Sequence, residues 1–317
     1  MLFGRSAKIT ASTFNNLKKL VLYRVLTLLV SLAVAAVIVY PSMKFLIGTA
    51  QLTNFITAIK DLFRNVFRGV DLTLFWKNLT EKGSVLFDFI QQNRASAMTA
   101  YGGIGLAILV FTFLRGLSSF FYGNAVSEYM STLSDLGFFH SFFRRLGHAV
   151  AYELVRFLFR VLSIAVCGAV GFAVFAYLPQ HIGVLSVLLY MAFLLFSMPF
   201  YFTLLGRMMP AMIVEKKNVF RAVGISFKGF GGRNFRNLYA CFFAVIFCCE
   251  VGIVVGTVAS FGIGILFLPT FASMWMVSVS FTDYYMNTGR RFYLDYDHVV
   301  VPKALRKEES LLSDINM

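Results

Sequence analysis

Six long apolar stretches dominate this chain, and no other feature constrains its fold as strongly. Each stretch is near or above the ~20 residues that an α-helix needs to cross the hydrocarbon core of a bilayer. They cover residues 20–47, 100–122, 150–178, 182–205, 237–260 and 263–286. The sequence therefore predicts an all-α fold, a polytopic membrane helical bundle with six transmembrane helices in a single membrane domain, 1–317.

The composition indicates that lipid is the main solvent of this chain. Of its 317 residues, 58% are hydrophobic and 14% are charged, whereas a soluble domain has about half and about a quarter. A net charge of +14 would suit nucleic-acid binding. However, the Lys and Arg residues lie beside apolar stretches, where cytoplasmic retention and anionic lipid headgroups both favour them. We therefore expect membrane lipids as partners, and no nucleic acid.

The short links between the apolar stretches alternate between basic and uncharged. Residues 1–19 contain four Lys or Arg and no acid, whereas the links 179–181 and 261–262 contain no Lys or Arg. The link 206–236 holds seven Lys or Arg against a single acid. Because cytoplasmic loops carry the excess of Lys and Arg, we predict that the link 206–236 is a basic cytoplasmic loop. The N-terminus and the C-terminal tail, 287–317, are predicted to be cytoplasmic too.

The segment 48–99 is predicted to lie on the outer side, as an extracytoplasmic helical insertion. It carries six Lys or Arg against four acids. Its apolar residues recur at three- and four-residue spacing, which is typical of amphipathic helices, and we expect such interfacial helices over 52–70 and 72–92. They could form a lid over an outward-facing cavity, or simply lie on the bundle or in the outer leaflet. We favour the second interpretation, because amphipathicity specifies an interface and not its purpose.

Glu250 is the only acid in the fifth apolar stretch and lies near its middle. A charge at that depth costs about 2.5–3.5 kcal/mol on insertion scales, so we expect the side chain to face protein or water. One hypothesis makes Glu250 a proton or cation site in a transport cycle, because desolvation favours the neutral carboxyl group. The other makes it a neutral or hydrogen-bonded residue that links helices. The sequence supports the two about equally.

A second set of charged residues lies near the predicted cytoplasmic ends of the second and third stretches. Glu153, Arg156 and Arg160 follow helical spacing, and Arg115 lies near the same side. Residues three or four apart share a helix face, so we expect Glu153 and the arginines to pair. With Glu250, the residues Glu153, Arg156 and Arg115 form our candidate substrate or proton site. They could also bind an anionic headgroup, although snorkelling and topology explain most of the pattern.

The basic residues of the cytoplasmic links are candidate contacts for anionic lipids. They are Arg144, Arg145, Lys216, Lys217, Arg221, Arg233 and Arg236. The run GFGGRNFR in the link 206–236 has the glycines and arginines of a phosphate cradle, but it lacks the spacing and the preceding strand of a nucleotide loop. We therefore interpret it as a flexible turn.

Gly252 and Gly256 form a GxxxG pair in the fifth stretch and would permit close helix contact. The sequence leaves open whether that contact is internal or between subunits. It contains no recognisable metal-ligand cluster, nucleotide loop or arrangement of Ser, His and acid, and its four cysteines lie inside apolar runs. We therefore expect no metal, no cofactor and no enzymatic activity.

One stretch resembles a known group of proteins. In the run YFTLLGRMMPAMIVEKKNVFRAVGISFKGF, the residues that carry the resemblance are Tyr201, Arg207, Pro210, Val214, Glu215, Ala222 and Ser226. This run is similar to the link after the fourth span in bacterial six-helix membrane proteins, which include the membrane domain attached to some glycerophosphodiester phosphodiesterases. The resemblance implies a six-helix fold in a bacterial plasma membrane. It does not imply hydrolysis, because the catalytic barrel of those enzymes is absent from this sequence.

These observations favour a carrier or a lipid-handling membrane protein with an intramembrane acidic site. The alternative is a non-transporting scaffold or accessory subunit of a membrane complex, which would act through its amphipathic helices and basic loops. The sequence leaves open a homo-oligomer or a membrane-protein partner.

Overall fold

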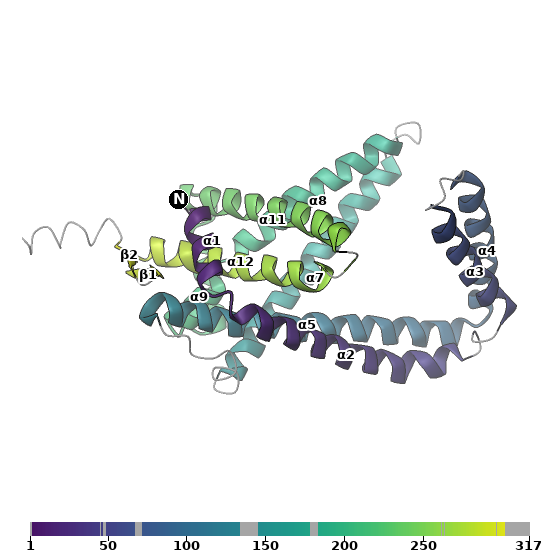
Figure 1. Ribbon diagram of the computed structural model, residues 1–317, viewed down its shortest axis with the longest axis horizontal. Helices are drawn as coiled ribbons and strands as arrows, with labels where there is room; N and C mark the ends of the chain where they lie inside the picture. The colour runs from purple at the N-terminus through teal and green to yellow at the C-terminus, as the bar shows by residue number, and fades with distance from the viewer. Residues whose placement is uncertain are drawn as a thin grey trace, which may run out of the picture. The chain divides into compact units, whose positions relative to one another are not determined.

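The computed structural model describes residues 2–44, 46, 49–66, 72–133, 145–177, 183–260, 262, 264–295 and 297–301. Within them the protein is almost entirely helical, as predicted (Figure 1). The helices are α1 (Leu2–Ser12), α2 (Asn16–Met43), α3 (Ala50–Val66), α4 (Leu72–Gln92), α5 (Arg94–Thr132), α7 (Leu146–Tyr177), α8 (Gly183–Leu205), α9 (Met208–Val214), α10 (Val219–Lys228), α11 (Arg233–Ala259) and α12 (Gly264–Asn287). An unpredicted antiparallel hairpin, β1 (Phe292–Asp295) and β2 (His298–Val300), follows α12. Arg144 and the tail from residue 302 lie outside the described residues.

The protein is a multi-pass membrane protein. Five helical segments in the described part of the chain are long and apolar enough to cross a bilayer. They are Asn16–Met43, Arg94–Thr132, Leu146–Val174, Val187–Val214 and Arg233–Ala259, and they overlap the first five predicted stretches. The sixth predicted stretch coincides with α12, which contains Pro269 and is not among those five.

The chain forms two compact units. Unit 2, Leu26–Thr112, contains most of α2, the helices α3 and α4, and the first half of α5. Within it α3 packs against α4, and the Ile38 side chain of α2 lies so close to Gly103 of α5 that a Cβ there would be 2.6 Å from it. The predicted insertion therefore belongs to a larger unit that includes the adjoining halves of two membrane helices.

Unit 1, Met1–Val25 and Phe113–Met317, is built around α12. This helix packs against α1, α9 and α11 (Figure 1), and its side chains from Val277 to Tyr285 are all buried. The link 206–236, predicted as basic and cytoplasmic, contains two helices, α9 and α10. Its first helix, α9, is almost wholly buried, because its sequence MMPAMIV is apolar on every side.

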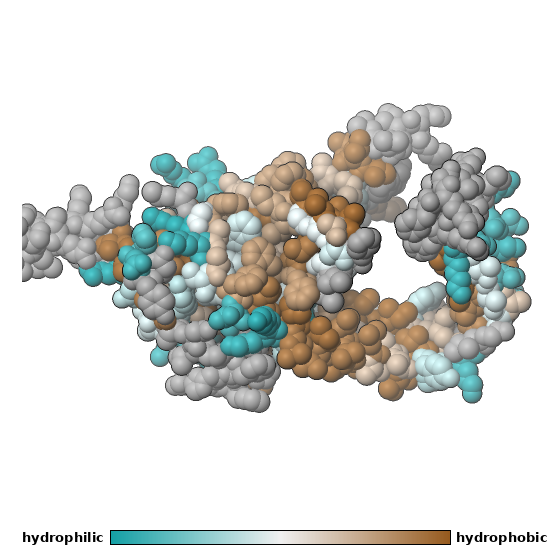
Figure 2. Space-filling view, in the orientation of Figure 1, coloured by the Kyte–Doolittle hydropathy of each residue, from teal (hydrophilic) through white to brown (hydrophobic). Residues whose placement is uncertain are grey.

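The exposed apolar side chains of unit 1 locate its lipid-facing part. On α11 the exposed large hydrophobic residues begin at Phe247 and continue to Val258, whereas the first turns of the helix expose arginines and asparagines. Figure 2 shows the same division, hydrophilic around the first residues of α11 and hydrophobic toward its end. On α8 the exposed apolar residues end at Phe200, and on α12 they end at Phe267. Apolar surface of this extent needs lipid around it, so these parts of α8, α11 and α12 face the membrane.

Candidate functional site

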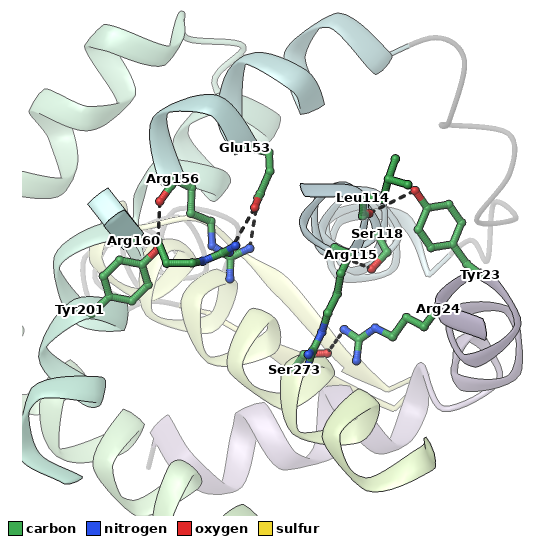
Figure 3. Close-up of polar contacts among 10 residues, drawn as sticks. All are labelled: Tyr23, Arg24, Leu114, Arg115, Ser118, Glu153, Arg156, Arg160, Tyr201 and Ser273. Carbon is green, nitrogen blue, oxygen red and sulfur yellow. Dashed lines mark hydrogen bonds and ion pairs between the residues drawn. The ribbon is translucent and has the colours of Figure 1, made fainter. Parts of the chain in front are cut away.

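A cluster of charged side chains lies inside unit 1 (Figure 3). We call it the arginine cluster. It consists of Arg24 on α2, Arg115 on α5, and Glu153, Arg156 and Arg160 on α7. The guanidinium groups are near enough to repel one another, Arg24 with Arg115 and Arg156, and Arg115 with Arg156 and Arg160. The fold therefore gathers like charges at a depth where each is costly to bury.

Glu153 anchors the cluster. Its side chain is fully buried, and its carboxylate pairs with Arg156 at 3.4 Å and with Arg160 at 3.1 Å. The pairing confirms what the helical spacing predicts. Gly116 on α5 makes room for the carboxyl group, which lies against the glycine Cα where any Cβ would overlap it. The helices α5 and α7 thus meet where the Glu153 carboxyl group packs against a glycine.

Two further residues of the cluster are held by neighbouring helices. Arg24 donates hydrogen bonds to the Pro269 carbonyl oxygen, at 3.3 Å, and to the Ser273 hydroxyl, both on α12. The carbonyl oxygen of Arg156 accepts a hydrogen bond of 3.2 Å from the Tyr201 hydroxyl of α8. The cluster therefore ties α2, α7, α8 and α12 together.

Other guanidinium groups of the cluster are only partly satisfied. Among the described residues, Arg115 has no hydrogen bond or ion pair through its side chain, although Figure 3 shows it directed toward Ser273 beside Arg24. The Nη1 atom of Arg160 is buried and has no hydrogen-bond partner in the same set. Since buried donors are normally satisfied, the Nη1 atom of Arg160 can donate to a further anionic or polar ligand, and the half-buried Arg115 guanidinium can do so too.

Two cavities adjoin the cluster. The smaller, of about 50 Å³, is bordered by Arg156 and by the hydroxyls of Ser119, Ser273 and Ser280, and is large enough for water. The larger, of about 210 Å³, is lined by Arg115 and Glu250 and otherwise almost entirely by apolar residues of α8, α11 and α12. Phe202 and Met276 line both cavities. Glu250 is exposed at the larger one, so the structure brings it onto the same cavity wall as Arg115, as our candidate site grouped them.

An apolar groove of about 500 Å³ runs between α7 and α8. It is lined mainly by aromatic and aliphatic side chains, among them Phe159, Leu162, Val166 and Phe196. Tyr201 lines both this groove and the smaller cavity that Arg156 borders. The groove therefore begins next to the arginine cluster and extends along the lipid-facing part of both helices.

The predicted lipid contacts are spread over the surface of unit 1. Lys216 adopts a left-handed backbone with φ of 52°, and with Arg145 and His148 it lines a basic hollow of about 280 Å³. Arg145 also donates a hydrogen bond of 2.7 Å to the Asn124 side chain. Lys217 is half-buried, whereas the remaining predicted contacts in the link 206–236 are exposed; these are Arg221, Arg233 and Arg236.

The two glycines of the GxxxG pair have different surroundings in the structure. Gly256 packs against Leu268 of α12. A Cβ added to this glycine would lie 2.5 Å from the Leu268 side chain, so Gly256 serves a contact between helices of the same chain. Gly252 is exposed and has no atom of another residue within 4 Å of its ideal Cβ position.

Sequence reasoning missed Arg24 and Ser273. Arg24 is a charge a few residues inside the first apolar stretch, and the argument that singled out Glu250 would have selected it too. Ser273 carried no signal, because serine is common in membrane helices and its partner lies 249 residues away in the chain. No group of metal-binding side chains occurs among the residues that the structure describes.

Comparisons with models of protein families, with curated proteins and with solved structures found no match to this chain.

Proposed function

We propose that this protein is a lipid-handling membrane protein, which binds the phosphate of a phospholipid at the arginine cluster and one acyl chain in the groove between α7 and α8. The observation that carries the proposal is that guanidinium groups with unsatisfied donors lie next to an apolar groove. Tyr201 lines both this groove and the cavity that Arg156 borders. Arginine suits a phosphate because its planar fork donates several hydrogen bonds. The groove would bury a hydrocarbon chain against side chains of the same polarity.

The arrangement supports lipid handling better than a scaffold without a ligand. A scaffold would need the amphipathic helices and basic links alone, and it would leave the Arg115 guanidinium without a partner among the described residues. A soluble substrate would not need an apolar groove that opens toward lipid. The exposed basic residues of the link 206–236 and the basic hollow fit the same proposal, because they would hold this end of the bundle against anionic headgroups.

Lipid retention by the purified protein tests the proposal. We expect Arg115→Gln to weaken retention of phospholipid about tenfold or more, since a hydrogen bond to a charged group contributes about 1.5–3 kcal/mol. The measurement is native mass spectrometry after limited delipidation in mild detergent. Arg94→Gln, an exposed charge at the start of the same helix α5, is the matched control and should retain lipid as the wild type does.

A second pair of variants tests the groove. Ser163→Trp should fill it and displace the acyl chain, whereas Val161→Trp places the same side chain on the lipid-exposed face of α7 and should have no effect. Equal lipid content in the arginine variant, the tryptophan variants and the wild type would rule out the proposed site.

We further infer that the N-terminus and the C-terminal tail lie in the cytoplasm, in a bacterial plasma membrane. Segments that the charge pattern assigns to the cytoplasm pack against one another in unit 1. Ser12 and Tyr129 both donate hydrogen bonds to the Leu294 carbonyl oxygen, at 3.4 and 3.3 Å, and Arg207 pairs with Asp283 at 2.8 Å. Contacts among the N-terminal segment, two links and the tail agree with a single cytoplasmic end.

Cysteine labelling in intact bacterial spheroplasts tests this orientation. In a chain whose four natural cysteines are replaced by alanine, a membrane-impermeant maleimide should label Gln91→Cys at once. It should label Lys216→Cys only after permeabilisation. Labelling of Lys216→Cys in intact cells would invert the proposed topology.

A further inference from the structure

The cavity shared by Arg115 and Glu250 holds two opposite charges that do not neutralise each other. Both side chains line it. The ion pairs among the described residues join Glu153 to Arg156 and Arg160, and Arg207 to Asp283, so Arg115 and Glu250 are not within ion-pair distance. Glu250 has no hydrogen bond or ion pair to any residue that the structure describes.

The rest of the cavity wall gives neither charge a partner. Apart from Cys249, it consists of apolar residues such as Met198, Ile253 and Pro269. A charged group in such surroundings is costly unless it is paired. A cavity that keeps one cation and one anion apart is therefore complementary to a ligand that carries one charge of each sign.

We propose that this cavity binds a headgroup that contains both a phosphate and a primary ammonium, with the phosphate at Arg115 and the ammonium at Glu250. The inference rests on the proposed lipid-handling function and names the class of headgroup. A purely anionic headgroup would satisfy Arg115 and place a second negative charge near Glu250. A purely cationic one would meet the repulsion of the arginine cluster.

The chemistry of the wall favours a primary ammonium over a quaternary one. A primary ammonium donates hydrogen bonds to a carboxylate, whereas quaternary ammonium groups are typically held among several aromatic rings. Phe202 is the aromatic residue among those that line the cavity. The carboxylate of Glu250 is thus the suitable partner, and it binds a group that still has protons to donate.

The position of Glu250 indicates the route of entry. Its neighbours Phe247, Val251 and Val254 are exposed on the lipid-facing part of α11, and Glu250 is itself exposed. A headgroup that leaves the bilayer surface would meet Glu250 at the mouth of the cavity and Arg115 deeper inside unit 1. The ligand would therefore enter from the membrane.

Competition between two lipids tests the inference. The intact protein is equilibrated in mixed micelles that contain equal amounts of phosphatidylethanolamine and phosphatidylglycerol with the same acyl chains, and the retained lipid is identified by native mass spectrometry. We expect the wild type to retain phosphatidylethanolamine preferentially. Glu250→Gln should lower the ratio of the two lipids about tenfold, while the total phospholipid retained stays the same. Cys249→Ser changes the same wall without changing its charge and should keep the wild-type ratio.

The outcomes separate this inference from the proposed function. If Glu250→Gln retains lipid with an unchanged ratio, the ammonium site is wrong and lipid handling stands. If the wild type retains no phospholipid, both are wrong. Addition of soluble phosphoethanolamine distinguishes the source of the ligand. If it displaces the lipid, the same paired charges bind a free solute as well, whereas no displacement assigns the site to lipid alone.

Discussion

Replacing Glu153 by glutamine is expected to lower the free energy of unfolding by about 3–5 kcal/mol, the usual effect of removing one partner from a buried ion pair. Glutamine has nearly the same shape, so packing is conserved and the change isolates the charge. Arg156 and Arg160 would then remain close together with no carboxylate between them. The amide group of glutamine would keep one acceptor oxygen for one arginine, but it would direct its NH2 donors toward the other guanidinium group, which is itself only a donor.

The measurement is denaturant-induced unfolding in mixed micelles, followed by circular dichroism. Glu250→Gln makes the identical chemical change in another membrane helix, at a residue that is exposed and without an ion pair among the described residues. We expect that control to change the stability by less than about 0.5 kcal/mol, as is usual for substitutions away from such networks. Similar losses in the two variants would show that Glu153 does not hold the cluster together.

Replacing Gly116 by alanine should be nearly as damaging, with a loss of about 2–4 kcal/mol. The new methyl group would occupy the position of the Glu153 carboxyl group. Overpacking alone usually costs about 1–3 kcal/mol. The Glu153 side chain would also have to move away from both arginines, so the loss of the ion pairs adds to that cost. The same unfolding measurement applies.

Two comparisons make the interpretation specific. Gly105→Ala lies on the same helix, where an added Cβ meets no atom within 4 Å, and it should be neutral or gain up to about 1 kcal/mol from helix propensity. In a double-mutant cycle, Gly116→Ala should cost less in a Glu153→Ala background, because the carboxyl group that it displaces is gone. Strict additivity of the two substitutions would refute the contact between α5 and α7.

Much of the secondary structure could be predicted because its signals are local. The helix α4 coincides with the second predicted amphipathic segment, and α8 and α11 lie within a few residues of their predicted bounds. Length and apolar content decide these elements without reference to any other part of the chain. The link 206–236 shows the limit of this reasoning. Its positive charge predicts the side of the membrane on which it lies, but it does not predict that the apolar first half forms α9 and enters the core.

The candidate site could be predicted only in part, for a related reason. Glu153, Arg156 and Arg160 are close in sequence, and helical periodicity alone brings them to one face. Arg24 joins the cluster only because α2 packs beside α5 and α12. No pattern within α2 contains that information, since the contact is made between residues far apart in the chain.

The sequence by itself determined that this chain lies in lipid, which stretches are helical, and where the charges stand along each helix, because hydrophobic length and periodicity are properties of neighbouring residues. Tertiary structure alone decided that Glu250 and Arg115 share a cavity, that Gly116 receives the Glu153 carboxyl group, and that a groove opens between α7 and α8. These features depend on which helix faces pack together. The packing is determined by the shapes and charges of side chains that are far apart in the sequence.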